Sequence, residues 1–168
     1  MKAVLQRVTS AGVAIDGGPR QGIGPGLVVL FGVEEGDREE YVDAFVQKIV
    51  HLRIFSDEAG KLNLSLLDQG YSVLAVPNFT LCANCKKGRR PSFERSARPN
   101  FASACFDALA AGLRAAGAAG RKPSPCAVSS GPADDFAPAL LFVQSVPPVS
   151  YTHLFPDFIF RHVVKPQK

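Results

Sequence analysis

The spacing of apolar positions changes several times along this 168-residue chain, and each change predicts a change of secondary structure. Residues 2–15 alternate roughly between apolar and polar side chains, which is typical of one or two strands. The continuous apolar run at 27–33 predicts a central strand that is buried on both faces. A further strand is expected at 71–76, and shorter strand patterns occur at 52–55 and 62–67.

Two segments show helical spacing instead. The first follows a D-x-x-E start signal at 37–40. Its apolar positions are Val42, Phe45, Val46, Ile49 and Val50. The second, at about 100–116, repeats an apolar residue every four positions with alanines between. The order of strands and helices predicts a single α+β domain, with antiparallel or mixed sheets curved into a barrel-like core and two covering helices.

These periodic patterns of strands and helices weaken after residue 120. Proline recurs at seven positions between 123 and 156, and 139–143 is the one clear strand pattern there. We therefore divide the chain into a body, residues 1–120, and a divergent C-terminal segment, residues 121–168. We expect the second part to be poorly packed.

Composition places the chain among globular proteins, with 46% hydrophobic and 20% charged residues. No apolar run is long enough to cross a membrane, and the first residues lack the apolar core of a signal peptide. A cytoplasmic protein without a membrane partner is the simplest expectation.

Positive charge is concentrated in one segment. Residues 82–98 carry six basic side chains against one acidic side chain, whereas residues 1–70 carry seven against ten. The densest cations are Lys86, Lys87, Arg89 and Arg90. Such a cluster either attracts a polyanion, nucleic acid first among them, or is a solvated loop.

The four cysteines give a weaker signal. Cys82 and Cys85 form a C-x-x-C pair, while Cys105 and Cys126 stand alone. A zinc site needs a second pair or suitably spaced histidines, so we expect no metal. Reduced thiols explain the pattern better than redox chemistry does.

The polar cluster Pro77-Asn78-Phe79-Thr80-Leu81, here called the elbow, stands directly before the cations. Pro77 cannot donate to a strand ladder, so the strand must end or lie at a sheet edge here. Backbone N–H groups around Phe79 and Thr80 are candidates for stabilising an oxyanion. No acid or base stands beside Thr80 in sequence, so a triad-like hydrolase is not indicated. The alternative is an ordinary strand-to-loop end.

Several segments together make residues 1–118 similar to the bacterial D-aminoacyl-tRNA deacylases, the D-tyrosyl-tRNA(Tyr) deacylase family. They stand in the family's order and near its spacing. They are MKAVLQRVTSAGVAIDG, GIGPGLVVLFGVEEGD, KIVHLRIFSDEAGKLNLSLLD, VPNFTL and KKGRRPSF.

The resemblance implies hydrolysis of the ester that joins a D-amino acid, and in some cases misattached glycine, to the 3′ end of tRNA. It also implies a cytoplasmic homodimer without metal or cofactor, whose active site lies at the dimer interface. The enzyme would serve as a chirality proofreader in translation.

The family motif Ser-Gln-Phe-Thr-Leu falls on the elbow. Asn78, Phe79 and Thr80 are then the catalytic candidates, and Pro77 and Leu81 are substrate-binding candidates. Asn78 is a shortened glutamine with the same donors and acceptors. The four cations of the basic segment would contact phosphates of the acceptor end. Attack by water assisted by the RNA is favoured over attack by a threonine alkoxide, because nothing local would activate the hydroxyl.

The end of the chain departs from the family. The family ends in a strand close to Val-Asn-Asp-Gly-Pro-Val-Thr, whose Gly-Pro enters the partner's pocket and excludes L-amino acids. Arg7 matches a residue that helps hold that loop. The nearest counterpart here is Pro147-Pro148, and Gly131-Pro132 has the dipeptide in other surroundings. The alternative is that residues 121–168 are a foreign or frame-shifted end.

Three rival functions remain open. One is a catalytically impaired tRNA-binding relative that lacks the chirality filter. The others are a thiol protein built on Cys82 and Cys85, and a generic esterase that uses Thr80.

We predict that the chain as given hydrolyses L- and D-aminoacyl-tRNA with little preference, or is inactive. Pro147 would fill space that glycine leaves empty and would fix φ near −65°, roughly, so the loop would sit elsewhere. Replacing residues 121–168 with a family-type ending should restore strict D-selectivity in a deacylation assay. Rejection of L-aminoacyl-tRNA by the unmodified chain by more than about a hundredfold, roughly 2.7 kcal/mol, would contradict this.

Overall fold

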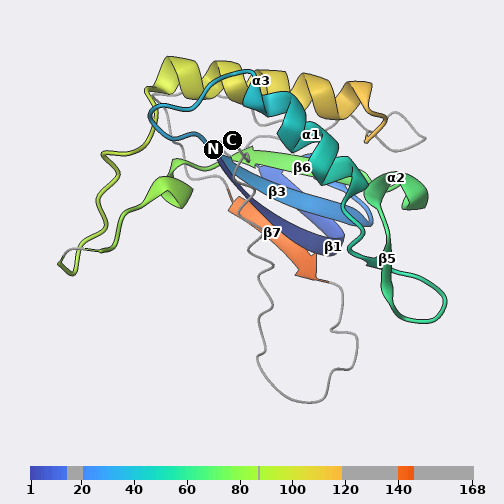
Figure 1. Ribbon diagram of the computed structural model, residues 1–168. Helices are drawn as coiled ribbons and strands as arrows, with labels where there is room; N and C mark the ends of the chain where they lie inside the picture. Colours follow the sequence, from blue (N-terminus) through green and yellow to red (C-terminus); the bar gives the residue numbers. More distant parts are fainter. Residues whose placement is uncertain (15–20, 87, 119–139, 146–168) are drawn as a thin grey trace.

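The fold was analysed in a computed structural model, which describes residues 1–14, 21–86, 88–118 and 140–145. For residues 140–145 only the backbone is described. The central feature is a mixed sheet that curls into half a barrel, with two long helices lying across one of its faces (Figure 1).

The sheet is built on β1 (Lys2–Ala14), a strand of 13 residues. β2 (Gln21–Ile23) and β3 (Gly26–Gly32) both pair antiparallel with β1. Their register is continuous, from Val13 opposite Gln21 to Lys2 opposite Gly32. β2 and β3 therefore run along the same edge of β1, and β7 (Leu140–Ser145) pairs antiparallel with β1 from the other edge.

β3 has the most enclosed position in the sheet. It lies between β1 and β6 (Ser72–Pro77), and it pairs with β6 in the parallel direction from Gly26–Ser72 to Phe31–Pro77. Its residues are buried except for the half-buried Leu30. A strand enclosed on both faces explains why its sequence is continuously apolar rather than alternating.

The two long helices are α1 (Tyr41–His51) and α3 (Pro99–Ala115). α3 begins with proline, which lacks the N–H that a first turn leaves unpaired. Both helices bury an apolar stripe against the odd-numbered core residues of β1, β3 and β6. The rings of Phe31 on β3 and Phe45 on α1 meet edge to face, with centroids 5.6 Å apart.

The opposite face of the sheet carries a second, smaller core. Its buried residues are Val8, Ala11, Val13, Ile23, Val28 and Leu74. Leu30 and Val76 pack against this group and are only half-buried. The sheet thus has apolar side chains on both faces, and the helices cover one of them.

Short elements connect α1 to β6. β4 (Phe55–Ser56) and β5 (Leu62–Leu64) form a separate two-stranded sheet, and α2 (Leu66–Gln69) follows. Ser65 and Asp68 form a capping box at the start of α2. The hydrogen bonds that Ser65 donates lower the pKa of the Asp68 carboxyl.

The predicted α+β class and the curved sheet with two covering helices are confirmed. The D-x-x-E start signal was wrong in detail, because α1 begins at Tyr41 and has no side-chain cap. Asp37 instead accepts a hydrogen bond from the Glu34 backbone N–H at 2.7 Å and pairs with the chain's terminal ammonium group. The divergent segment lies largely outside the described residues. None of the described helices is long and apolar enough to cross a membrane.

Gly26→Ala should destabilise the fold by about 1–3 kcal/mol or more, since this is the usual cost of overpacking. A Cβ at Gly26 would lie 1.9 Å from the backbone oxygen of Ser72, so β3 and β6 would have to separate. Gly24→Ala is the matched control, since nothing lies within 4 Å of its added Cβ. Urea unfolding followed by circular dichroism measures both, and equal midpoints for the two variants would contradict this account of the β3–β6 pairing.

Candidate functional site

The elbow lies where the β3–β6 pairing ends. Pro77 is the last residue of β6, opposite Phe31, and the Asn78 N–H extends the ladder by one bond of 2.7 Å to the Phe31 carbonyl. β6 stands at the end of the strand order, which agrees with the edge position predicted from Pro77. The chain then turns into the short 3₁₀-helix η1 (Phe79–Cys82).

Asn78 caps η1 with its side chain. Its Oδ1 accepts a hydrogen bond of 3.0 Å from the Thr80 N–H and a second from the Thr80 hydroxyl. The Thr80 amide is therefore engaged within the elbow. An amide oxygen accepts a hydrogen bond but does not take up a proton near neutral pH, so Asn78 orients the Thr80 hydroxyl without activating it.

The elbow is tied to its neighbours through backbone oxygens. Lys2 Nζ donates to the Leu81 carbonyl at 3.3 Å, and Ser96 Oγ donates to the Phe79 carbonyl at 3.4 Å. The Phe79 ring meets Phe93 at a centroid distance of 5.2 Å. These contacts join the start of β1, the elbow and the loop that precedes α3.

The part of the basic segment between Asn84 and Ser92, here called the basic loop, forms a hairpin-like loop beside the elbow. Asn84 and Ser92 close it with two backbone hydrogen bonds of 2.8 and 3.0 Å. Gly88 lies at its tip with φ of 72°, a conformation that suits glycine. The exposed side chains of Lys86, Arg89 and Arg90 project from this loop, while Lys87 lies outside the described residues.

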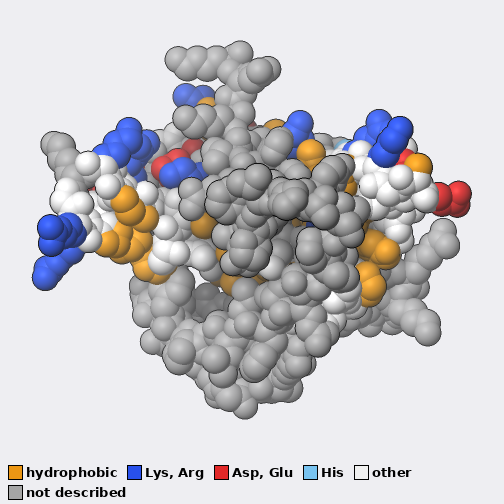
Figure 2. Space-filling model, turned by 90° about the horizontal axis from the view of Figure 1, so that it is seen from below, with side chains coloured by type: hydrophobic (Ala, Val, Ile, Leu, Met, Phe, Trp, Pro, Cys, Tyr) orange, Lys and Arg blue, Asp and Glu red, His pale blue; other side chains and the backbone are white. Residues whose placement is uncertain are grey.

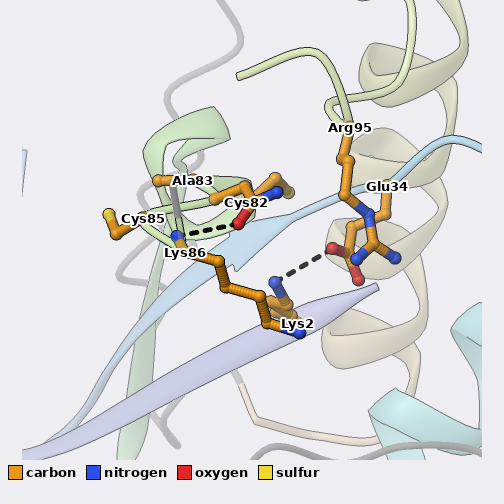
Figure 3. Close-up of a pocket in the computed structure, with 8 residues that line it drawn as sticks. Lys2, Glu34, Cys82, Ala83, Cys85, Lys86 and Arg95 are labelled. Carbon is orange, nitrogen blue, oxygen red and sulfur yellow. Dashed lines mark hydrogen bonds and ion pairs between the residues drawn. The ribbon is translucent and has the colours of Figure 1, made fainter. Parts of the chain in front are cut away.

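A hollow of about 370 Å³ lies between the start of β1, the end of η1 and this loop (Figure 3). Its lining residues are Lys2, Glu34, Cys82, Ala83, Asn84, Cys85, Lys86 and Arg95. Lys2 and Glu34 form an ion pair of 2.9 Å inside it, and the Arg95 side chain points toward Glu34. The hollow does not include Pro77–Leu81, so it adjoins the elbow rather than forming it.

Two of the three described cysteines, Cys82 and Cys105, are buried, and Cys85 is exposed. The Cys82 thiol donates to the Val33 carbonyl at 3.3 Å, and Cys105 lies on the buried side of α3 in the main core. Burial raises the pKa of both thiols, and Glu34 and Glu39 add to the respective shifts. A raised pKa lowers the fraction of nucleophilic thiolate. No three His, Cys, Asp or Glu residues of the described part lie close enough to hold a metal.

The structure brings together most of the sequence-derived candidates. Pro77 to Leu81 and the cations at 86, 89 and 90 lie at one end of the molecule. Arg7 lies apart from them on β1, where it pairs with Leu27 of β3. Its side chain donates a hydrogen bond of 3.0 Å to the Ile54 carbonyl. Pro147 and Pro148 lie outside the described residues.

Sequence reasoning missed two contributors to this region. The capping role of Asn78 was readable from an asparagine two residues before a threonine at a strand end, because Asn bonds the backbone two residues on. The contact between Phe79 and Phe93 joins residues 14 positions apart and has no local signal.

Most of the described chain is similar to known proteins of one family. A family model for D-Tyr-tRNA(Tyr) deacylase matches residues 4–131. A D-aminoacyl-tRNA deacylase of Pelobacter propionicus is 50% identical over 119 residues, which are 71% of this chain and 82% of the relative. One of Chloroflexus aurantiacus is 52% identical over 115 residues, which are 68% of this chain and 72% of the relative.

Solved structures agree with this fold. The c-Myc DNA Unwinding Element Binding Protein superposes with a TM-score of 0.73 at 34% identity, over 89% of this chain and 95% of that one. A probable eukaryotic D-amino acid tRNA deacylase gives 0.67 over 86% and 93%, and its 16% identity supports the fold alone. The matched region takes in most of β1, the strands β2, β3 and β6, both long helices, the elbow and the basic loop. This chain therefore belongs to the D-Tyr-tRNA(Tyr) deacylase family.

Proposed function

We propose that this chain hydrolyses the ester bond of D-aminoacyl-tRNA, releases free tRNA and the D-amino acid, and so proofreads chirality in translation. Misattached glycine is a second substrate under this proposal. The observation that carries it is the joint placement of the elbow and the basic loop at one end of the molecule. Relatives of about 50% identity that are named D-aminoacyl-tRNA deacylase support it.

The elbow receives the aminoacylated ribose of the terminal adenosine. Water attacks the ester carbonyl, the bond between the acyl carbon and the ribose oxygen breaks, and that oxygen takes up a proton. The neighbouring 2′-hydroxyl of the substrate orients the water and relays the proton. Asn78, Phe79 and Thr80 contribute hydrogen bonds and shape around the reacting ester, with Pro77 and Leu81 flanking it.

This assignment follows from the hydrogen bonds of the elbow. The Thr80 hydroxyl donates to an amide oxygen, which gives it no general base. A mechanism that uses the substrate's own hydroxyl does not need one. The generic esterase with Thr80 as nucleophile is therefore the less favoured alternative.

The basic loop binds the acceptor end of the tRNA. Lys86, Arg89 and Arg90 are exposed on a loop whose base is closed by backbone hydrogen bonds. Lys87 joins them under this proposal. Contacts to phosphates position an RNA without reading its sequence, which suits an enzyme that must accept many tRNAs.

The active unit is a homodimer whose active site lies at the interface, and it acts in the cytoplasm, where aminoacyl-tRNA is made. Two half-buried apolar residues, Leu30 and Val76, lie on the sheet face opposite the helices. They support the proposal that a second copy of the chain packs against this face. Under this proposal Arg7 is the residue that would hold a loop excluding L-amino acids, and Pro147-Pro148, which lies outside the described residues, is the nearest counterpart of that loop in the sequence. No metal or cofactor takes part.

The second candidate is a catalytically impaired relative that binds tRNA without hydrolysing its ester. The departure of residues 121–168 from the family ending favours it. Single-turnover incubation of the full chain with D-tyrosyl-tRNA separates the two functions. Release of D-tyrosine supports the deacylase, whereas saturable binding with an unchanged ester supports the impaired relative.

Thr80→Ala should retain substantial single-turnover deacylation of D-tyrosyl-tRNA, within about tenfold of the unmodified chain, because its hydroxyl has no base to activate it. Thr80→Ser is the control, since serine keeps a hydroxyl at the same place. A drop by several orders of magnitude in Thr80→Ala alone, with tRNA affinity preserved, would identify Thr80 as the nucleophile.

Arg89→Ala combined with Arg90→Ala should weaken tRNA binding and flatten its salt dependence. Each lost phosphate contact lowers the slope of log affinity against log salt by about one unit. Arg38→Ala with Arg114→Ala is the matched control, because it removes two exposed positive charges elsewhere. If both double variants keep the slope of the unmodified chain, the basic loop faces away from the RNA.

A further inference from the structure

Two aromatic rings stand exposed beside the basic loop. The described residues include three exposed large hydrophobic side chains, Leu62, Phe79 and Phe93, with 45%, 39% and 36% of their surface open to solvent. Leu62 lies on β5, away from the loop. Phe79 and Phe93 form a pair with an angle of 62° between their ring planes, and both side chains keep part of their surface exposed.

The pair is held by backbone structure rather than by a mobile loop tip. Phe79 begins η1, which Asn78 caps. Phe93 opens a turn in which the Ser96 N–H donates to its carbonyl at 2.9 Å. The following residues are fixed to the end of β3, since the Ala97 N–H donates to the Val33 carbonyl at 3.0 Å. Rings placed in advance lose little entropy when they bind a ligand.

Exposed basic residues stand close to Phe93 in the sequence. Arg89, Arg90 and Arg95 are exposed within four residues of Phe93, and the acid in this stretch is Glu94. Seen from the side opposite the helices, blue basic side chains flank a hydrophobic patch at the end of the molecule that this loop forms (Figure 2). Exposed aromatic rings within a cationic rim are the composition that binds unpaired nucleotides, whose bases stack while their phosphates pair.

We propose that Phe79 and Phe93 form a stacking platform for a base of the unpaired 3′ end of the tRNA, next to the aminoacylated terminal nucleotide. The inference rests on the proposed function, because the elbow that would hold the ester also supplies Phe79. The platform grips the single strand through base stacking, and the basic loop grips it through phosphates. Stacking accepts any base, as a site that serves many tRNAs requires.

An RNA strand fits this surface better than a protein partner does. A protein interface core is depleted of charged residues, whereas three exposed arginines lie within four residues of Phe93 in the sequence. A second copy of the chain would bring the same positive charge to the same place if the patch met itself, and like charges would repel.

Fluorescence anisotropy with two RNA hairpins that carry no amino acid tests the platform. One carries an unpaired 3′ CCA end, and the other carries the same end with abasic nucleotides, which keep the phosphates but cannot stack. The unmodified chain should bind the complete hairpin at least about fivefold more tightly, since stacking contributes about 1–3 kcal/mol per base. Phe93→Leu should bind both hairpins equally, with its salt dependence unchanged.

Phe93→Trp should keep the preference for the complete hairpin, and Leu62→Ala should keep it as the control for an exposed apolar residue elsewhere. Equal binding of the two hairpins by the unmodified chain would overturn the proposal, as would a preference retained in Phe93→Leu. A change of oligomeric state in Phe93→Leu, measured by sedimentation, would also overturn it, because the ring would then cover another protein chain.

The hairpins carry no ester, so their binding is measured independently of hydrolysis. Hydrolysis of D-tyrosyl-tRNA by the same preparations is followed separately. A chain that prefers the complete hairpin but leaves the ester intact would keep the platform and remove the proposed deacylase function. A chain that hydrolyses the ester but does not distinguish the hairpins would do the reverse.

Discussion

The parallel pairing of β6 with β3 is the constraint on which the candidate site depends. It runs in register from Gly26–Ser72 to Phe31–Pro77, and the Asn78 N–H adds one further bond. Pro77 contributes no N–H to the ladder, and directly after Asn78 the chain enters η1. Because β3 is enclosed by its neighbours and by two apolar layers, the point at which β6 leaves it is held firmly. The pairing at the centre of the sheet therefore fixes the position of the elbow.

The same geometry explains why a short polar cluster stands next to a run of cations. The loop after η1 returns along the end of β3, where the Glu35 N–H donates to the Arg95 carbonyl and Ala97 pairs with Val33. The basic tip is thereby brought beside the elbow instead of extending into solvent at a distance. A substrate that carries both an ester and adjoining phosphates has the chemistry to engage both features. In this account, the protein contributes position and hydrogen bonds, while the RNA contributes the hydroxyl that assists water.

Much of the fold was readable from the sequence because burial leaves a periodic trace. The run at 27–33 became the enclosed β3, and the residues at helical spacing from Val42 to Val50 became the buried stripe of α1. Signals that depend on one polar side chain were less reliable. Asp37 was read as a helix cap, but the Met1 ammonium group and the Glu34 N–H engage it instead. Met1 stands 36 positions away, so its pairing with Asp37 cannot be seen locally.

The site was predictable as a set of residues but not as an arrangement. The elbow and the cations are contiguous motifs, and the family resemblance located both. The contacts of Phe93 with Phe79 and of Lys2 with Leu81 cross the fold and required the structure. The most direct test of the account compares D-tyrosyl-tRNA that carries a 2′-hydroxyl on its terminal ribose with the 2′-deoxy form, both esterified at the 3′ position. We predict single-turnover hydrolysis of the first at least about a hundredfold faster, roughly 2.7 kcal/mol of barrier. Equal rates would contradict the account and assign the attack to a protein group.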